Sequence, residues 1–179
     1  MLQSHNAMTT QRIIRKNNAV NPRQFLEKIV INSGVGRLSQ QPNFEEKILP
    51  RVKQDIAAIS GQMPHVRRSK KSIAGFKMRE GQIVGVRATL RGKKMVAFFN
   101  RLIMIVLPRV RDFRGINPKA VDAGGVLSLG LREQLAFNEI NPEESTLIFP
   151  FEVSIVPRRK DRAEALAAYR DLGVPLKKQ

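Results

Sequence analysis

Residues 84–91, VGVRATLR, alternate apolar with small or polar side chains at the two-residue period of a β-strand. The inward positions of this strand are expected to be Val84, Val86, Ala88 and Leu90. The outward positions are then Gly85, Arg87, Thr89 and Arg91. We therefore predict a strand that buries one face and presents a cationic, hydroxyl-bearing face, which is suited to contact RNA.

The segments on both sides of this strand predict an α+β fold. Further strands are expected at 25–32, 126–131 and 147–156, and helices at 44–60, 93–106 and 161–172. Asn43 is expected to cap the first of these helices, and Pro50 to kink it. Elements in this order are typical of a two-layer α+β domain, with helices packed on one face of an antiparallel-rich sheet and a long basic loop.

The length of the chain favours one domain. A compact chain of 179 residues buries roughly 70% of its unfolded surface, which is enough for a single core. We predict a single α+β domain over residues 25–179. Residues 1–24 are expected to be a basic arm or a short helix. An organellar presequence is the alternative, although this segment is rich in Asn and Gln rather than Arg and Ser.

The charge of the chain indicates an anionic partner, and nucleic acid is the first candidate. Lys and Arg number 32 against 15 Asp and Glu, which gives a formal net charge of +17. Between Asp55 and Asp112 the only acid is Glu80. The cations of this stretch are the footprint of a surface that binds RNA phosphates, and they include Arg67, Arg68, Arg87 and Arg91.

The centre of the basic stretch, KKSIAGFKMREG at 70–81, is expected to be a mobile loop. Its cations are Lys70, Lys71, Lys77 and Arg79, and they surround Ser72, Ile73, Ala74, Gly75 and Phe76. Gly75 and Gly81 would allow backbone angles that other residues resist. Such a loop suits a curved polyanion. A solvated basic loop without a partner is the alternative.

The residue types argue against several other functions. Cysteine is absent, and His5 and His65 are the only histidines, so the sequence suggests no disulfide, no metal site and no cofactor. Gly34 and Gly36 lack the third glycine of a dinucleotide-binding motif. No apolar run approaches the roughly 20 residues of a membrane span. We therefore expect no enzyme, no small-molecule substrate and no membrane partner.

One segment has the opposite charge. Residues 133–157 contain no Lys or Arg, and their acids are Glu133, Glu139, Glu143, Glu144 and Glu152. RNA would be repelled by this surface. The segment is either an ordinary solvated connection between strands or a contact for a basic protein.

Seven separated motifs closely resemble those of one protein family. They are IVINSGVG at 29–36, SGQMP at 60–64, KKSIAGFKMREG at 70–81, VRATLRG at 86–92, FFNRLIMIVLPRVRDFRGINPK at 98–119, LGLREQLAF at 129–137 and LGVP at 172–175. In this order and spacing they are similar to large-subunit ribosomal protein five, the bacterial-type family that binds 5S ribosomal RNA. The resemblance covers nearly all of residues 25–175. The sequence departs from the family pattern at 124–130 and at Asn138.

The resemblance implies a structural component of the large ribosomal subunit, in its central protuberance, on cytoplasmic or organellar ribosomes. It implies that 5S and other large-subunit ribosomal RNA contact the sheet, with an RNA-reading patch of Asn32, Gln62 and Thr89 beside the four arginines named above. The basic loop would contact transfer RNA in the peptidyl site. A hairpin from 137 to 151 would face protein thirteen of the small subunit through Glu139, Glu143 and Glu144. Neighbouring proteins of the central protuberance would be further partners.

Other interpretations stay open from the sequence. Asn32 and Gln62 are residue types that also cap turns, which would give them a structural role. A free, sequence-indifferent RNA-binding protein or chaperone would carry the same excess of positive charge. A nucleic-acid-processing enzyme would need clustered ligands or catalytic groups, and the sequence offers none.

Overall fold

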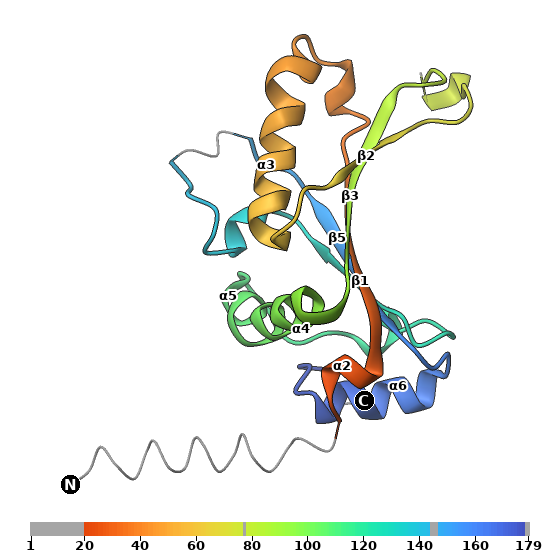
Figure 1. Ribbon diagram of the computed structural model, residues 1–179, viewed down its shortest axis with the longest axis vertical. Coiled ribbons are helices and arrows are strands. Elements are labelled where there is room, and N and C mark those ends of the chain that lie inside the picture. Colours follow the sequence, from red (N-terminus) through yellow and green to blue (C-terminus); the bar gives the residue numbers. More distant parts are fainter. Residues whose placement is uncertain (1–19, 77, 144–146, 178–179) are drawn as a thin grey trace, which may run out of the picture.

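A computed structural model describes residues 20–76, 78–143 and 147–177 of the protein. Five antiparallel strands form one sheet in the order β2-β3-β1-β5-β4 (Figure 1). The strands are β1 (Leu26–Gly34), β2 (His65–Arg68), β3 (Ile83–Leu90), β4 (Leu127–Leu131) and β5 (Phe151–Pro157). Because β1 is central, it joins segments that are far apart in the sequence.

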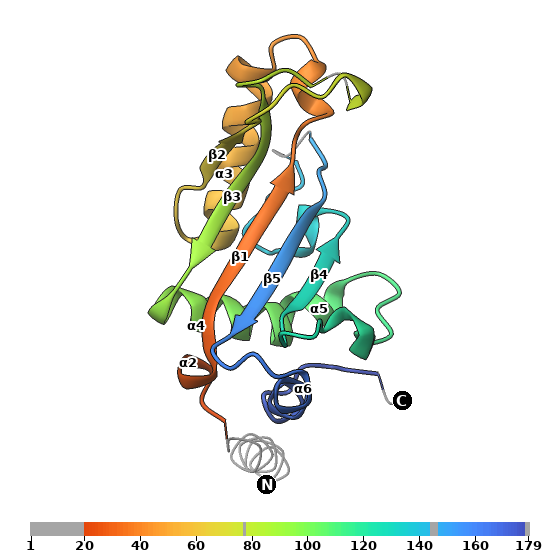
Figure 2. The ribbon, with the colours of Figure 1, turned by 90° about the vertical axis from the view of Figure 1, so that its right-hand side faces the viewer.

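Helices cover one face of the sheet, as predicted. The α-helices of the described chain are α2 (Pro22–Phe25), α3 (Leu49–Ser60), α4 (Gly92–Arg101), α5 (Leu107–Arg109) and α6 (Arg162–Asp171), and α3 and α4 are the ones that cover this face. In Figure 2 the strands lie in front of α3 and α4, and α6 lies across the lower end of the sheet. The predicted α+β class is confirmed. Residues 1–19 lie outside the described residues, so the arm at 1–24 and the single domain at 25–179 stay predictions.

The hydrophobic core lies between the sheet and helices α3 and α4. Ile29 and Ile31 of β1 are fully buried, and so are Ile56 of α3 and Phe98 of α4. Apolar residues recur on both helices at a spacing of three and four, so each helix turns one apolar face to the sheet. Each such side chain contributes about 1.5–3 kcal/mol when it is fully buried. Packing of these side chains therefore fixes which face of the sheet is turned toward α3 and α4.

The strand predicted at 84–91 is β3, with one change in register. Its inward side chains are buried as expected at Val86, Ala88 and Leu90. Val84 is only half-buried, and Ile83, which is 3% exposed, faces the core in its place. The pairing of β2 with β3 shifts between Arg67 and Arg68, and this bulge changes which side chain points inward.

The helix predicted at 44–60 has two parts. Phe44–Ile48 form a π-helical turn in which the Leu49 N–H donates to the Phe44 carbonyl, and α3 follows directly. Asn43 has a left-handed backbone conformation (φ 59°) and its side chain makes no capping hydrogen bond, so the predicted cap is wrong. Pro50 is the second residue of α3 and follows directly on the π-helical turn. It therefore lies where the helix changes from π to α geometry.

The helix predicted at 93–106 continues further than expected. It begins at Gly92, and a π-helical turn at Leu102–Val106 joins α4 to α5. Pro108 lies in the first turn of α5 and therefore does not end the helix. The chain becomes extended at Val110, which follows α5.

The strand predicted at 147–156 begins only at Phe151. Residues 147–150 lie instead beside Gln134, whose side chain is fully buried. The Gln134 Oε1 accepts a hydrogen bond from the Phe149 N–H (3.1 Å), and its Nε2 donates to the Leu147 carbonyl. The side-chain amide thus satisfies backbone groups that a neighbouring strand would otherwise have to pair.

A tyrosine fixes α6 to the end of the sheet. Tyr169 is fully buried, and its hydroxyl lies 3.0 Å from the Gly125 carbonyl oxygen and 3.1 Å from that of Ile155. Its ring meets Phe25 edge-on, with 5.3 Å between ring centroids. Burial raises the pKa of Tyr169 well above its usual range, so the phenol stays protonated in the folded protein.

We predict that Tyr169 ionises only as the protein unfolds. Because its pKa is raised by folding, its contribution to stability is complete below about pH 10, the unfolded pKa, and is lost as the pH rises further. The sequence has one tyrosine and no tryptophan, so tyrosinate absorbance reports this residue alone. In an alkaline titration the absorbance should appear together with loss of far-UV circular dichroism. Ionisation at about pH 10 with the dichroism intact would contradict the prediction.

Candidate nucleic-acid interface

The sheet face opposite the helices, here called the open face, carries rows of side chains that cross the strands. Directly paired residues on neighbouring strands point to the same face of a sheet. The successive pairs therefore form one row across the five strands: His65, Arg87, Asn32, Glu152 and Gly130. Every residue of this row is exposed or half-buried.

The next row along the open face carries Thr89, Val30, Ser154 and Ser128. Thr89 and Arg87 alternate with buried Ala88 on β3, just as Asn32 alternates with buried Ile31 on β1. The structure thus brings together three of the residues that the sequence singled out, namely Asn32, Arg87 and Thr89. The pairing of β1 with β3 places them on one surface.

Gln62 lies at the edge of this surface and has a structural contact. Its Nε2 donates to the Thr89 carbonyl (2.8 Å), beyond the point where β2 stops pairing with β3. The backbone carbonyl of Gln62 accepts a hydrogen bond from the Ser60 hydroxyl (2.8 Å). The amide nitrogen therefore completes a strand edge, which agrees with the structural role that the sequence left open. The same contact holds Gln62 beside Thr89.

The four arginines predicted to bind RNA are held in different ways. Arg67 is exposed on β2 and shares the open face with His65, two residues earlier. The Nε atom of Arg87 is buried without a hydrogen-bond partner. Arg68 donates a hydrogen bond from Nη1 to the Gly81 carbonyl (3.0 Å), at the base of the predicted basic loop at 70–81. Arg91 follows the end of β3 and belongs to a separate charged cluster.

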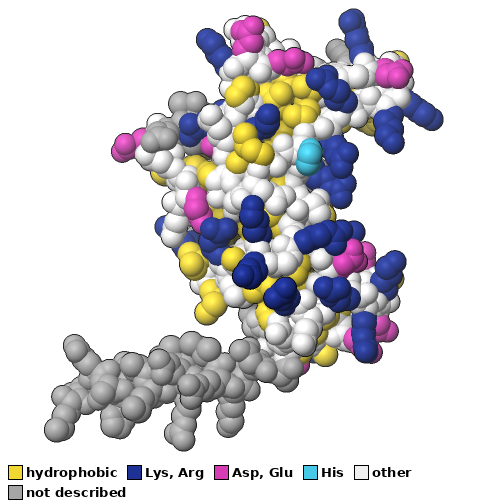
Figure 3. Space-filling model, in the orientation of Figure 1, with side chains coloured by type: hydrophobic (Ala, Val, Ile, Leu, Met, Phe, Trp, Pro, Cys, Tyr) yellow, Lys and Arg dark blue, Asp and Glu magenta, His cyan; other side chains and the backbone are white. Residues whose placement is uncertain are grey.

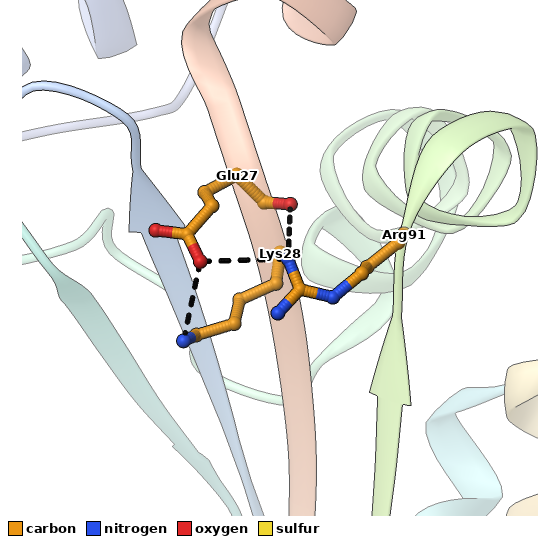
Figure 4. A network of polar contacts seen from close by, with 3 residues as sticks. All are labelled: Glu27, Lys28 and Arg91. Carbon is orange, nitrogen blue, oxygen red and sulfur yellow. Dashed lines mark hydrogen bonds and ion pairs between the residues drawn. The ribbon is translucent and has the colours of Figure 1, made fainter.

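This cluster joins Glu27, Lys28 and Arg91 (Figure 4). Arg91 Nη1 lies 3.3 Å from the Glu27 backbone oxygen and 3.4 Å from its carboxylate, and Lys28 Nζ lies 3.3 Å from the same carboxylate oxygen. The hydrogen bond and charge of Lys28, and then those of Arg91, hold the pKa of Glu27 below its usual value. The ionised carboxylate therefore orients both cations.

Sequence reasoning missed Glu27 and Lys28 because their contact with Arg91 crosses between β1 and β3. The signal that would have found them is the strand register. Pairing of Ile29 with Leu90 brings the residues just before Ile29 next to the residue just after Leu90. Only a correct alignment of these two strands would have shown this.

The predicted basic loop is an extension of β2 and β3, here called the basic hairpin (residues 69–82; Figure 1). At its base the Ser69 N–H donates to the Gln82 carbonyl (2.8 Å). Near its tip Ile73 and Met78 exchange backbone hydrogen bonds of 2.9 and 3.2 Å. A 3-10 turn at Ala74–Phe76 closes the tip. Its predicted mobility stays a prediction.

The two glycines of the basic hairpin differ. Gly81 has the positive φ expected of it (79°), which few other residues adopt without strain. Gly75 does not have a positive φ, and a Cβ atom there would meet no atom within 4 Å. The predicted need for glycine at position 75 is therefore wrong on backbone grounds.

The tip of the basic hairpin exposes apolar and cationic side chains together. Phe76 is 72% exposed and Ile73 is 43% exposed. The other exposed residues of the predicted contact are Lys70, Lys71, Ser72, Ala74, Gly75 and Arg79, whereas Lys77 lies outside the described residues. Figure 3 shows Lys and Arg side chains gathered on this hairpin and down the same side of the molecule. A cationic rim around an exposed ring suits a nucleic-acid surface.

The acidic segment does not form the predicted hairpin at 137–151. Between Phe137 and β5, the described residues form turns and no strand pairs. Glu139 is ion-paired with Arg101 of α4, whose Nη2 also donates to the Ile59 carbonyl of α3 (2.9 Å). Glu143 is exposed, and Glu144 lies outside the described residues. Side-chain contacts rather than a β-ladder therefore attach this segment to the helices.

A second polar contact attaches the same segment to α3. The Asp55 carboxylate is nearly buried, and it lies 3.2 Å from Arg51 Nε. The buried Gln134 Nε2 lies 3.5 Å from the other carboxylate oxygen. A buried carboxylate needs such partners because burial without them is costly. Gln134 therefore links α3 to the stretch at 147–149 that precedes β5.

Two models of known protein families match this chain. A family model described as "Ribosomal protein L5" matches residues 22–79, and a second model, which describes the C-terminus of the same ribosomal family, matches residues 83–176. The chain belongs to the ribosomal protein L5 family. The first match contains β1 and β2, and the second contains β3, β4 and β5, so the sheet is built from both.

Curated proteins of the ribosomal protein L5 family resemble this chain over most of its length. "Large ribosomal subunit protein uL5" of Rubrobacter xylanophilus is 47% identical over 152 residues, which are 85% of this chain and 82% of that protein. "Large ribosomal subunit protein uL5c" of Tetradesmus obliquus is 48% identical over 150 residues, 84% of this chain and 81% of that protein. The uL5 protein of Trichormus variabilis is 46% identical over 154 residues, 86% and 82% of the two chains.

Membership of the ribosomal protein L5 family makes the chain a ribosomal protein and not an enzyme. In the part of the chain that the structure describes, no helix is long and apolar enough to cross a membrane. Within the same residues, no three or more His, Cys, Asp or Glu side chains are grouped so that they could hold a metal ion.

Proposed function

We propose that the chain is a structural constituent of the large ribosomal subunit that binds 5S ribosomal RNA on the open face of its sheet. The observation that carries the proposal is the surface formed by Asn32, Arg87 and Thr89 on two paired strands. Its family relatives are named as proteins of the large ribosomal subunit. Other large-subunit RNA and neighbouring proteins of the central protuberance are the further partners that this role implies.

The proposed binding divides affinity from specificity. Arginines on and beside the open face neutralise phosphates and release counterions, which gives affinity that falls as salt rises. Asn32 and Thr89 offer small polar groups that both donate and accept hydrogen bonds. Folded RNA helices hide their major grooves, so such groups read unstacked bases, 2′-hydroxyls and shape. The protein therefore recognises a folded RNA surface.

Substitutions on the open face should separate these two contributions. Asn32→Ala should weaken 5S ribosomal RNA binding by about 1–2 kcal/mol and leave binding to unrelated RNA unchanged. Arg87→Gln should weaken both and reduce the salt slope by about 1. Arg170→Gln, on the exposed side of α6, is the matched control and should behave as the parent protein. Parent-like 5S binding by both open-face variants in a salt titration would contradict the proposal.

The basic hairpin is proposed to contact transfer RNA in the peptidyl site. Phe76 and Ile73 lie exposed at its tip, and Lys70, Lys71 and Arg79 are exposed beside them. An apolar tip with a cationic rim contacts the shape and phosphates that all transfer RNAs share, without reading their sequences. The hairpin extends beyond the ends of β2 and β3 and away from the rest of the sheet (Figure 1), so the two proposed RNA contacts are separate.

Replacing residues 70–81 by a short turn should separate the two RNA contacts. The Ser69–Gln82 hydrogen bond closes the base of the hairpin, so β2 and β3 should keep their pairing. We expect unchanged 5S ribosomal RNA affinity and reduced occupancy of the peptidyl site by transfer RNA on assembled ribosomes. Loss of 5S binding with normal transfer RNA occupancy would contradict the assignment. Phe76→Ala, which keeps the full hairpin, tests the apolar tip alone.

The acidic segment is proposed to face protein thirteen of the small subunit. Exposed Glu143 is the described residue best placed for it, because Glu139 is already paired with Arg101. Contact between opposite charges tolerates movement between subunits better than apolar packing does. A solvated connection is the alternative that the sequence left open.

Charge reversal at Glu143 should weaken subunit association at low salt only. An exposed ion pair contributes about 0–1 kcal/mol and is screened as the ionic strength rises. Glu143→Lys ribosomes should therefore dissociate more readily than parent ribosomes in low-salt gradients and equally in high salt. Glu46→Lys, an exposed acid in the π-helical turn before α3, is the control. Equal association of both variants at every salt concentration would return the segment to a solvated connection.

A further inference from the structure

A glutamate lies directly beside the proposed RNA surface on the open face. Glu152 of β5 pairs directly with Asn32 of β1 on one side and with Gly130 of β4 on the other. It is exposed and points to the open face together with Asn32 and Arg87. In the sequence it belongs to the acidic stretch at 133–157, but the sheet separates it from Glu139 and Glu143 and places it among the predicted RNA contacts.

The carboxylate of Glu152 is not neutralised by a cation of the described chain. The ion pairs found there involve other acids, and the hydrogen bond to Glu152 is a long one of 3.4 Å from the Ser154 hydroxyl. Arg87 lies two strands away, at about 10 Å for a strand spacing of about 4.8 Å. An unpaired negative charge on a surface that binds phosphates lowers affinity, unless it makes a favourable contact with the RNA.

The surroundings of Glu152 leave room for a flat ring. Gly130 has no side chain, and a Cβ atom there would meet nothing within 4 Å. Along β5 the neighbour on the same face is Ser154, whose side chain is small. On the β1 side the paired residue is Asn32, whose strand lies about 4.8 Å away. The neighbours of the Glu152 carboxylate on the open face are therefore small, apart from Asn32.

We propose that Glu152 binds the Watson–Crick edge of an unstacked guanine in the bound RNA, an inference that rests on the proposed function. A carboxylate has two acceptor oxygens and no donor when ionised. The guanine edge offers two neighbouring donors, N1–H and the N2 amino group, which match these oxygens. Adenine and cytosine offer one amino group beside a ring acceptor, and the carboxylate repels that acceptor. Glu152 therefore favours guanine over adenine and cytosine, and also over uracil, whose single N3–H donor lies between two carbonyl oxygens that repel the carboxylate.

The proposal predicts a sign opposite to that of simple charge repulsion. If Glu152 only repels phosphates, its neutralisation strengthens binding to every RNA. If it accepts two hydrogen bonds from a guanine, neutralisation removes one acceptor and sets a donor against the base. Binding to the specific RNA then weakens, although the net charge of the protein has become more positive.

Glu152→Gln is the variant that distinguishes the two cases. We expect 5S ribosomal RNA binding to weaken about tenfold to a hundredfold, the range of one bidentate base contact. Binding to an unrelated RNA of equal length should stay the same or become slightly tighter. Glu143→Gln removes the same charge away from the sheet and should leave 5S binding unweakened. Far-UV circular dichroism checks that both variants fold.

An inosine scan identifies the base. Inosine lacks the N2 amino group, so replacing the contacted guanine should weaken binding of the parent protein and have little effect on Glu152→Gln, because the partner is already lost. Equal or tighter 5S binding by Glu152→Gln, equal losses on both RNAs, or no guanine that couples to Glu152 would each overturn the inference. Failure of the parent protein to prefer 5S ribosomal RNA would instead remove the proposed function, and this inference with it.

Discussion

The pairing of β1 with β3 and β5 is the constraint on which the rest of the structure depends. Burial of Ile29 and Ile31 against the helices fixes this register, because a slip of one residue would carry both to solvent and bring Asn32 into the core. The same register places Arg87 and Glu152 beside Asn32. The positions of the polar side chains on the open face therefore follow from packing on the other face. Stability and recognition share one alignment of strands.

Covering only one face of the sheet separates two demands on the chain. The helix side holds the apolar side chains that stabilise the fold, whereas the open face is free to carry arginines, small polar residues and a carboxylate. A net charge of +17 opposes compaction, and a polyanion relieves that repulsion. The protein should therefore be more stable with RNA bound than alone, since a ligand that binds only the folded state stabilises it.

The alternating sequence at 84–91 was sufficient to predict β3 and the outward positions of Arg87 and Thr89, because burial of one face leaves a period of two in the sequence. It was wrong for Gly85, which is buried, and Arg91 follows the end of the strand. The bulge at Arg67, which turns Ile83 inward in place of Val84, produced no recognisable pattern in the sequence. Nor did the buried amide of Gln134, which replaces a strand at 147–150 through contacts made far along the chain. Pro50 and Pro108 were misplaced because π-helical turns precede them. The acidic stretch was predicted as one surface, although the sheet order divides Glu152 from Glu139. The local sequence pattern was enough to predict most helices and strands. Which residues lie together on the open face depends on the pairing of strands that are far apart in the sequence.

The basic hairpin joins the end of β2 to the start of β3, and its base is closed between Ser69 and Gln82. The strand that leaves the hairpin, β3, then carries Arg87 and Thr89 a few residues further on. The hairpin therefore acts as a cantilever: its base is anchored in β2 and β3, and its tip projects beyond the sheet. A lateral force on Phe76 produces its largest bending moment where the hairpin joins the sheet, next to the bulge at Arg67. Any object pressing on the tip thus loads the strand that carries two of the proposed 5S RNA contacts.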